Sequence, residues 1–342
     1  PKVSLTAAEQ TVSESAGTVT VQVALNHSTD VTVTVPYTVG GTATGPAGGD
    51  SADHYLSVGT FEIGPDNTAA SVEFQVVDDD LYERDETVVI TLGAPSGATL
   101  GSPDVQTITI LDNDPMPEIA FSSTAYSAGE AAGTTQITVT LSGATALTAT
   151  VQYTTGGGTA IPGEDYLTAS GTLTYPPGVT SQTFSITLLD DGLPAENKTV
   201  GLILSTPVSA SLGLDSATLT LVDDDSMPEI SFGSAAYSAG EAGGTTQITV
   251  TLSGATALTA TVQYTTSGGT AIPGEDYLAA SGTLTFTPGT TSQTFPVTIL
   301  DDGICEGDET IGLTMHDPTS ASLGLGSAPN LLVRCTGVAV VV

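Results

Sequence analysis

An acidic segment recurs three times along this chain, with a period of about 111 residues. It reads DDDLYERDE at 78–86, DDGLPAENK at 190–198 and DDGICEGDE at 301–309. The flanking sequence recurs as well, and the stretches that begin at Tyr126 and Tyr237 are nearly the same for about fifty residues. A repeat of this length is a whole domain, so the sequence predicts repeat one at 1–114, repeat two at 115–225 and repeat three at 226–342.

Within each repeat, apolar residues alternate with polar ones. Ile248, Val250 and Leu252 alternate with threonines, and the segments 295–299 and 311–315 follow the same pattern. A period of two is typical of strands that bury one face. About seven such runs per repeat, separated by Gly, Pro, Ser and Asp, indicate an all-β protein of three tandem immunoglobulin-like antiparallel β-sandwiches, arranged as a rod.

The net charge and residue content limit the partners and the cellular location that can be expected for this chain. The formal net charge is −34 and the chain holds four Lys and Arg, which argues against nucleic acid or an anionic membrane as a partner and favours cations or basic surfaces. Because 12% of residues are charged and 39% are hydrophobic, the acids lie within folded domains rather than a disordered tail. No apolar run is long enough to predict a membrane span. Abundant Thr, Ser and Gly with two cysteines favour an extracellular or cell-surface protein.

The clustered carboxylates need a counter-charge. Carboxylates this dense repel one another, and four Lys and Arg cannot neutralise 38 Asp and Glu. A metal ion is therefore the expected counter-charge. Ligands made only of oxygen favour a hard cation and argue against zinc or copper, and calcium accepts six to eight oxygens in irregular geometry. The alternative is a solvated acidic surface without ions.

Five ordered elements carry a resemblance to a known family. These are a Glu near the first strand, Gly-x-Asp-Tyr at 163–166 and 274–277, Gly-Thr-Leu-Thr-Tyr/Phe, Asp-Asp-x3-Glu-x2-Glu, and a closing Asp triplet. In this order they resemble the Calx-beta domain of sodium–calcium exchangers, integrin tails and bacterial surface proteins. The resemblance implies calcium at one end of each sandwich, where the loop before the sixth strand meets the chain leaving the last strand.

The resemblance also implies the ligand positions in repeat one. They are Glu14, Asp53, Asp78, Asp79, Glu83, Glu86, Asp112 and Asp114. Asp53 is the least certain match, because the segment 51–55 lacks the glycine and is interpreted here as inserting His54 before the tyrosine.

Repeat two is predicted to bind calcium more weakly or to bind fewer ions. Ala195 and Lys198 stand where repeat one has Glu83 and Glu86, and the Lys198 ammonium would occupy the place of an ion. The acidic positions that repeat two keeps are Glu130, Asp165, Asp190, Asp191, Asp223, Asp224 and Asp225.

Repeat three loses the closing triplet. Aligning 323–325 with 212–214 places Arg334 at the position of Asp223 and Cys335 at that of Asp224. In the family's geometry these segments converge, which implies a Cys305–Cys335 disulfide in place of an ion, with Arg334 offsetting Asp301 or Asp302; two free thiols are the alternative. The acidic positions that repeat three retains are Glu241, Asp276, Asp301, Asp302, Glu306 and Glu309.

The sequence does not predict an enzyme. His27, His54 and His316 have no metal-ligand spacing and are predicted to be surface or loop residues. The carboxylates recur in every repeat, whereas catalysis usually needs one site. The leading hypothesis is a structural or adhesion module that calcium rigidifies at its loops and interdomain joints. Two alternatives stay open: a calcium sensor that transmits domain reorientation, and a subunit of a surface filament assembled by β-strand addition through 338–342.

Overall fold

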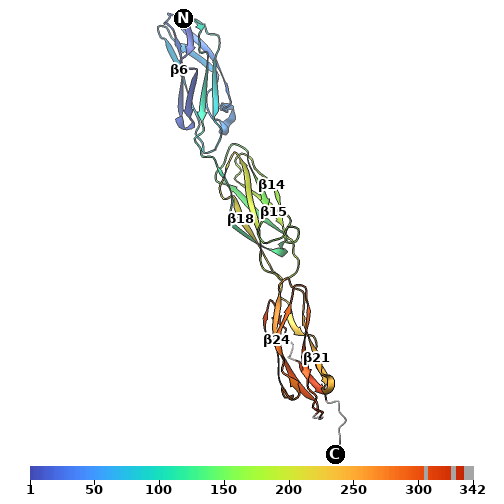
Figure 1. Cartoon of the computed structure of the whole chain (residues 1–342). Coiled ribbons are helices and arrows are strands. Elements are labelled where there is room, and N and C mark those ends of the chain that lie inside the picture. Colours follow the sequence, from blue (N-terminus) through green and yellow to red (C-terminus); the bar gives the residue numbers. More distant parts are fainter. Residues whose placement is uncertain (304–306, 325–328, 335–342) are drawn as a thin grey trace, which may run out of the picture.

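Three β-sandwiches follow one another in the computed structural model, which describes residues 1–303, 307–324 and 329–334. They lie end to end, with repeat one at one end of the row, repeat two in the middle and repeat three at the other end (Figure 1). Each consists of two sheets, so the all-β prediction and the tandem sandwiches are confirmed. In the part of the chain that is described, no helix is long and apolar enough to cross a membrane.

Repeat one has a four-stranded sheet in the order β6-β3-β1-β8 and a five-stranded sheet in the order β2-β9-β7-β4-β5. Its elements are β1 (Lys2–Leu5), β2 (Glu9–Ser13), η1 (Glu14–Ala16), β3 (Thr18–Leu25), β4 (Val33–Gly41), η2 (Pro46–Ser51), β5 (Gly59–Ile63), β6 (Ala69–Gln75), β7 (Glu86–Leu92), β8 (Thr99–Leu100) and β9 (Val105–Leu111), where η marks a short 3₁₀ turn.

Repeat two has the same plan, with sheets β15-β12-β10-β17 and β11-β18-β16-β13-β14. Its elements are β10 (Glu118–Phe121), β11 (Ala125–Gly129), η3 (Glu130–Ala132), β12 (Thr134–Leu141), β13 (Ala149–Thr155), β14 (Ser170–Tyr175), β15 (Ser181–Thr187), β16 (Lys198–Val208), β17 (Ser211–Leu212) and β18 (Ser216–Val222).

Repeat three adds a short strand to its first sheet, giving β23-β25-β21-β19-β27 beside β20-β28-β26-β22-β24. Its elements are β19 (Glu229–Phe232), β20 (Tyr237–Gly240), η4 (Glu241–Gly243), β21 (Thr245–Leu252), β22 (Ala260–Gly269), β23 (Tyr277–Leu278), β24 (Ser281–Phe286), β25 (Ser292–Ile299), β26 (Glu309–Thr319), β27 (Ser322–Leu323) and β28 (Asn330–Arg334).

Most strand pairs are antiparallel, but each repeat also has two parallel pairs. In repeat one these are β1 with β8 and β2 with β9. They arise because the first strand breaks into two halves, β1 and β2, that run in the same direction. The β1 half joins the four-stranded sheet, and the β2 half joins the five-stranded sheet, where it pairs with the last strand, β9. The break positions the site, because the 3₁₀ turn that carries Glu14 directly follows β2.

Each sandwich buries its own core, as the alternating pattern predicts. In β3, Val19, Val21 and Val23 are buried while the threonines and glutamine between them are exposed. In repeat two, Tyr153 of β13 stacks on Phe184 of β15, with ring centroids 4.0 Å apart, which joins the two sheets. The interior is thus held by apolar packing, and the described carboxylates of the recurring acidic segment lie outside it, in loops or at the first residue of a strand.

His54 corrects one sequence interpretation. It bridges to Val76 as Tyr166 bridges to Leu188, so the histidine replaces the tyrosine of the motif and is not an insertion. His54 does lie in a loop, but it is 2% exposed and therefore not a surface residue. Burial lowers the pKa of its imidazole. Tyr55, which was taken for the motif tyrosine, is 55% exposed.

The register of the last strand corrects a second interpretation. Gly240 of β20 pairs with Arg334, whereas Gly129, at the same place in repeat two, pairs with Val222. Arg334 therefore occupies the position of Val222 and not that of Asp223. The error came from aligning the preceding turn, since the chain between that turn and β28 is one residue longer in repeat three.

Candidate metal centres

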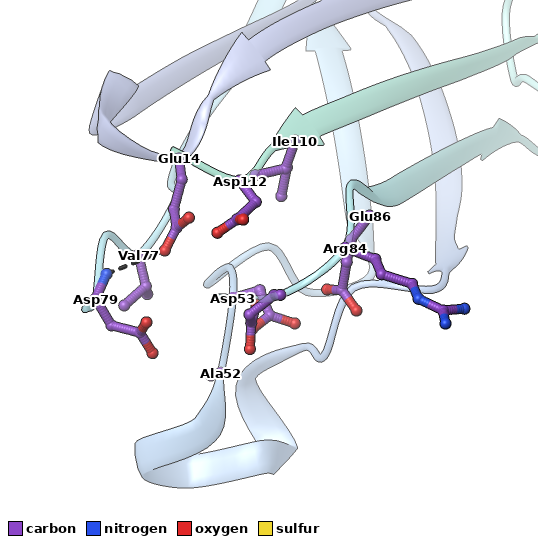
Figure 2. Close-up of a pocket in the computed structure, with 10 residues that line it drawn as sticks. Glu14, Ala52, Asp53, Val77, Asp79, Arg84, Glu86, Ile110 and Asp112 are labelled. Atoms are coloured by element: carbon purple, nitrogen blue, oxygen red, sulfur yellow. Dashed lines mark hydrogen bonds between the residues drawn. The ribbon is translucent and has the colours of Figure 1, made fainter. Parts of the chain in front are cut away.

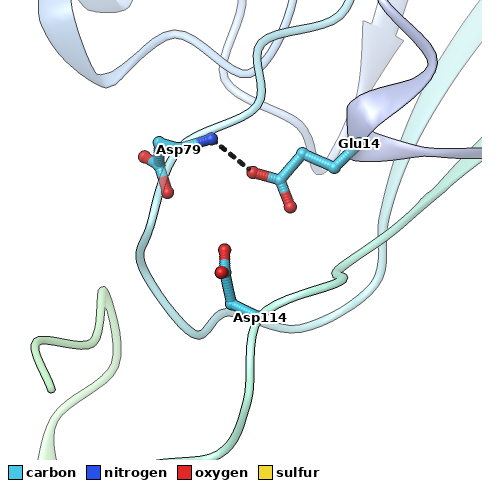
Figure 3. Close-up of side chains that lie close together, drawn as sticks. All are labelled: Glu14, Asp79 and Asp114. Carbon is cyan, nitrogen blue, oxygen red and sulfur yellow. Dashed lines mark hydrogen bonds between the residues drawn. The ribbon is translucent and has the colours of Figure 1, made fainter.

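Three parts of repeat one bring a first group of carboxylates together at the end of the sandwich that faces repeat two. Glu14 comes from η1, Asp79 from the loop after β6, and Asp114 from the chain that leaves β9. One oxygen from each lies within 4.8 Å of the others, and Figure 3 shows the three side chains converging. We call this group cluster A.

The local fold holds Glu14 at the centre of cluster A. Ser13 caps η1 by accepting a hydrogen bond from the Ser15 amide. This cap begins the turn at Glu14, the first residue of η1. The Asp79 amide donates to Glu14 Oε1 at 3.0 Å. Glu14 is 6% exposed, and this burial is the main reason that the pKa of its carboxyl is raised.

A second group, cluster B, lies beside the first and consists of Asp53, Glu83 and Glu86, again with one oxygen each within 4.8 Å of the others. Asp53 is fixed by the Thr44 amide, which donates to its Oδ2. Burial, followed by the charges of neighbouring carboxylates, raises the pKa of Glu83 to about 7; burial and the contact with Asp53 raise the pKa of Glu86 to about 8. Without a cation, this group holds protons that carboxyls normally release.

Glu14 and Asp79 of cluster A and all three residues of cluster B line one small cavity, and Asp112 lies among them (Figure 2). Asp112 accepts from the Asp114 amide at 3.4 Å, and burial raises the pKa of its carboxyl. Arg84 is the basic residue of this acidic segment, yet Figure 2 shows its side chain extending away from the carboxylates, and the residue is exposed. The arginine therefore leaves the clusters without a neutralising partner.

Repeat two, all of whose residues the structure describes, has a counterpart of cluster A. Glu130, Asp191 and Asp225 meet within the same 4.8 Å limit, and burial together with nearby carboxylates raises the pKa of Glu130 to about 7. In place of cluster B, Lys198 Nζ lies 2.5 Å from Asp165 Oδ1. The Lys198 ammonium therefore lies beside the aspartate that corresponds to Asp53; that it takes the place of an ion stays a prediction.

The remaining predicted positions lie around these groups rather than in them. Asp78 Oδ1 accepts from Asn113 Nδ2 at 3.2 Å. Asp190 accepts from the Gly192 amide at 2.9 Å, and Asp223 accepts from the Ala195 amide at 3.0 Å. Asp224 is exposed. The first three carboxylates hold their loops by hydrogen bonds, and the role of all four as direct ligands stays a prediction.

Repeat three is described in part. Asp276 Oδ2 accepts from the Ile272 amide at 2.6 Å, as Asp165 does from Ile161 in repeat two, and Asp301 Oδ1 accepts from the Gly303 amide. Glu241 begins η4 and Glu309 begins β26, as their counterparts do. Glu306, Cys305 and Cys335 lie outside the described residues, so the predicted disulfide is not tested. The contributions of Glu241, Asp276, Asp301, Asp302 and Glu309 also stay predictions.

Sequence reasoning missed two kinds of residue. Asn113 accepts from the Ser15 amide at 3.2 Å and so ties the exit strand to η1. Thr145 and Thr256 are buried polar residues that touch the acidic loop of the preceding repeat. The two threonines occupy equivalent positions in their repeats. The sequence contains this recurrence, but nothing in it distinguishes these residues from other loop threonines.

The donor sets fit a hard cation. Two oxygens bound to one calcium ion are at most about 5 Å apart, because each lies roughly 2.3–2.6 Å from the metal; both clusters of repeat one satisfy this. One oxygen in each of Glu86, Asp114, Glu130 and Asp225 is buried and has no hydrogen-bond partner in the protein. Buried oxygens normally have one, so these atoms are suited to a cation.

The chain is similar to several known proteins. The Calx-beta domain family matches residues 1–114, 112–225 and 223–330. Extracellular matrix protein 3 of Lytechinus variegatus is 31% identical over 309 residues, and FRAS1-related extracellular matrix protein 2 of Homo sapiens is 30% identical over 326. The matches cover 83% and 88% of this chain and 10% of each relative, so the chain spans about a tenth of their length. A crystal structure of the calcium binding domain CBD12 of CALX1.1 has 24% identity and a TM-score of 0.33, covering 64% of this chain and 99% of that one.

Proposed function

The chain belongs to the Calx-beta domain family, and from this membership we propose that it is a non-enzymatic, calcium-binding structural and adhesion module of the extracellular space. The Calx-beta family is a family of calcium-binding modules. The observation that carries the proposal is the pair of carboxylate clusters in repeat one, which join η1, the loops around β6 and β7, and the exit strand. An ion there would link segments that lie far apart along the chain.

The proposal assigns ions by repeat, with the repeats bounded at 1–114, 115–225 and 226–342. Clusters A and B would each hold a calcium ion in repeat one, with Asp112 contributing to both. Repeat two would hold one ion at Glu130, Asp191 and Asp225, because Lys198 neutralises Asp165 where the second ion would bind. Calcium supplies charge neutralisation and loop cross-linking here, and the protein supplies the oxygens.

The location of the clusters supports a role in stiffness. They lie at the end of repeat one that leads into repeat two, next to the linker that follows Asp114. An ion held partly by the exit strand would fix the direction in which the chain leaves the sandwich. The named relatives are extracellular matrix proteins, which supports an extracellular location and a mechanical role.

Two other readings predict different behaviour. A calcium sensor would need weak sites that empty and fill as calcium changes, whereas a structural module would have sites saturated at extracellular calcium concentrations. A filament formed by strand addition would depend on 338–342, which lie outside the described residues. The two clusters favour the structural module, because each gathers three carboxylates around one point.

Calorimetric unfolding of the chain tests the proposal. We expect millimolar calcium to raise the unfolding temperature strongly relative to chelator, and magnesium at the same concentration to raise it little, because magnesium demands a compact octahedral site. Equal unfolding temperatures in calcium and chelator would mean that the carboxylates form a solvated acidic surface, and the proposal would be wrong.

A further inference from the structure

The acidic loop of repeat one touches repeat two through a buried threonine. Thr145, in the loop between β12 and β13, is 0% exposed, and its Oγ1 donates to the Tyr82 carbonyl at 2.7 Å. The Ala146 amide donates to the same carbonyl at 3.2 Å. The Leu147 amide donates in turn to Thr145 Oγ1 at 3.0 Å. A contact within repeat two therefore orients the hydroxyl that donates to repeat one across the joint between the two repeats.

The second joint repeats this arrangement with equivalent atoms. Thr256 is 1% exposed, and its Oγ1 donates to the Pro194 carbonyl at 3.1 Å. The Ala257 amide donates to that carbonyl at 3.2 Å, and the Leu258 amide donates to Thr256 Oγ1 at 3.0 Å. Tyr and Pro differ as side chains, which shows that the contact depends on the backbone carbonyl of the acidic loop.

Repeat one supplies an internal comparison for these contacts. Thr29 follows Leu25 by four residues, as Thr145 follows Leu141, and its carbonyl accepts from the Asp66 amide as that of Thr145 accepts from Gly178. The hydrogen bonds of Thr29 stay within repeat one, and the residue is half-buried rather than buried. The loop therefore keeps its shape without the interdomain contact, and the burial of Thr145 and Thr256 comes from docking.

The contacted carbonyl lies inside the metal-binding segment. Asp79 Oδ1, in cluster A, accepts from the Leu81 amide at 2.8 Å, and the residue after Tyr82 is Glu83 of cluster B. In repeat two, Asp191 Oδ1 accepts from the Leu193 amide at 2.8 Å, directly before Pro194. An ion that orders this loop therefore also orders the carbonyl on which the next repeat docks.

We propose that Thr145 and Thr256 are positioning residues that couple ion binding in one repeat to docking of the next. This inference rests on the proposed calcium sites and names the atoms through which they act on the joints. Coupling is reciprocal, so the docked threonine raises the calcium affinity of the preceding repeat just as the ion strengthens the joint. In this proposal, ions in repeat one strengthen the joint between repeats one and two, and the ion in repeat two strengthens the joint between repeats two and three. A change at one joint should therefore leave the calcium affinity at the other unchanged.

A calcium titration of the full chain, followed by amide hydrogen exchange, tests the coupling. Protection of the segment 78–86 reports the ions of repeat one, and protection of 190–198 reports that of repeat two. Thr145→Val keeps the side-chain shape and removes the hydroxyl. We expect it to raise the calcium midpoint for 78–86 about fivefold and to leave the midpoint for 190–198 unchanged; Thr256→Val should do the reverse.

Two controls make the result specific. Thr29→Val alters the equivalent loop where no repeat is docked, so both midpoints should stay at the wild-type value. Thr145→Ser keeps the hydroxyl and should restore the midpoint for 78–86. Wild-type midpoints in Thr145→Val would overturn the coupling but leave the calcium sites intact. If calcium protects neither segment in the wild-type chain, the proposed function itself fails, and the coupling fails with it.

Discussion

Repeats one and two solve the same electrostatic problem in different ways. Both place an aspartate at the acidic end of the sandwich, the half-buried Asp53 in one and the buried Asp165 in the other, and both hold it with a backbone amide. In repeat one its neighbours are two glutamates, so neutralisation has to come from outside the chain. In repeat two its neighbour is Lys198, so the chain carries its own cation.

The difference shows what a side-chain cation cannot do. The Lys198 ammonium hydrogen-bonds and pairs with one carboxylate, Asp165, whereas calcium accepts six to eight oxygens. The ammonium therefore offsets charge at one point, while an ion also binds separate loops together. In repeat two the charge of Asp165 is neutralised without an ion, but its loops lack the cross-link that a second ion would provide. The stability of repeat two should therefore depend less on calcium than that of repeat one.

Calcium removal should produce the largest difference between the two repeats. At calcium concentrations of 100 times the dissociation constant, each ion stabilises its domain by about 2.7 kcal/mol, which gives about 5 kcal/mol for repeat one and half of that for repeat two. Hydrogen exchange of the core strands, measured per repeat in calcium and in chelator, checks this. Equal losses in both repeats would contradict the ammonium substitution.

Lys198→Met should destabilise repeat two by about 2 kcal/mol, because the change leaves a buried carboxylate uncompensated, although the Lys198 side chain is 27% exposed and solvent weakens the pair. The Asp165 side chain is 7% exposed. Chemical denaturation in chelator measures the effect, with Lys2→Met as the control, since Lys2 is exposed. A loss no larger than that of the control would show that Asp165 does not depend on the ammonium.

Glu86→Lys should convert the second site of repeat one into that of repeat two. We expect the chain to bind one calcium ion fewer and to lose about half of the calcium-dependent stabilisation of repeat one. Equilibrium dialysis with metal analysis counts the ions, and Glu73→Lys on the exposed face of β6 is the control of equal charge. The double change Ala195→Glu with Lys198→Glu should add an ion in repeat two; an unchanged count in both variants would rule out cluster B as an ion site.

The smallest expected effect is a pH dependence of the calcium-free chain. Burial raises the pKa of Glu83 from 4.5 to about 7 and that of Glu86 from 4.5 to about 8. Between the unfolded and folded values, the folded state binds protons that the unfolded chain has released, so stability falls as pH rises through this window. Melting temperatures across it should decrease, and the decrease should be weaker in the variant with Glu83→Gln and Glu86→Gln. A rise with pH would reverse the sign and contradict the raised pKa values.

Much of the site was predictable because ligand type and order along the chain are sequence properties. The recurrence of Glu14, Asp79 and Asp114 in repeat two as Glu130, Asp191 and Asp225 marked the carboxylates that cluster A brings together. The replacement of Glu86 by Lys198 indicated a cation among the carboxylates of repeat two, and the structure supplies its partner, Asp165. Asp78 and Asp190 looked equally suitable, but each accepts a nearby hydrogen bond outside the clusters, and the direction of a side chain in a loop depends on backbone geometry.

The sequence by itself determined the number of domains, the β-sandwich class and the acidic end of each repeat, because repeat length, the two-residue period and carboxylate density are local properties. Tertiary structure decided the rest. It placed His54 in the position of a buried tyrosine, set Arg334 one position earlier than the alignment, and divided the acids of repeat one into two clusters. It also buried Thr145 against a carbonyl 63 residues away. These features depend on segments that are distant in sequence and meet only when the sheets pack, so no local pattern specifies them.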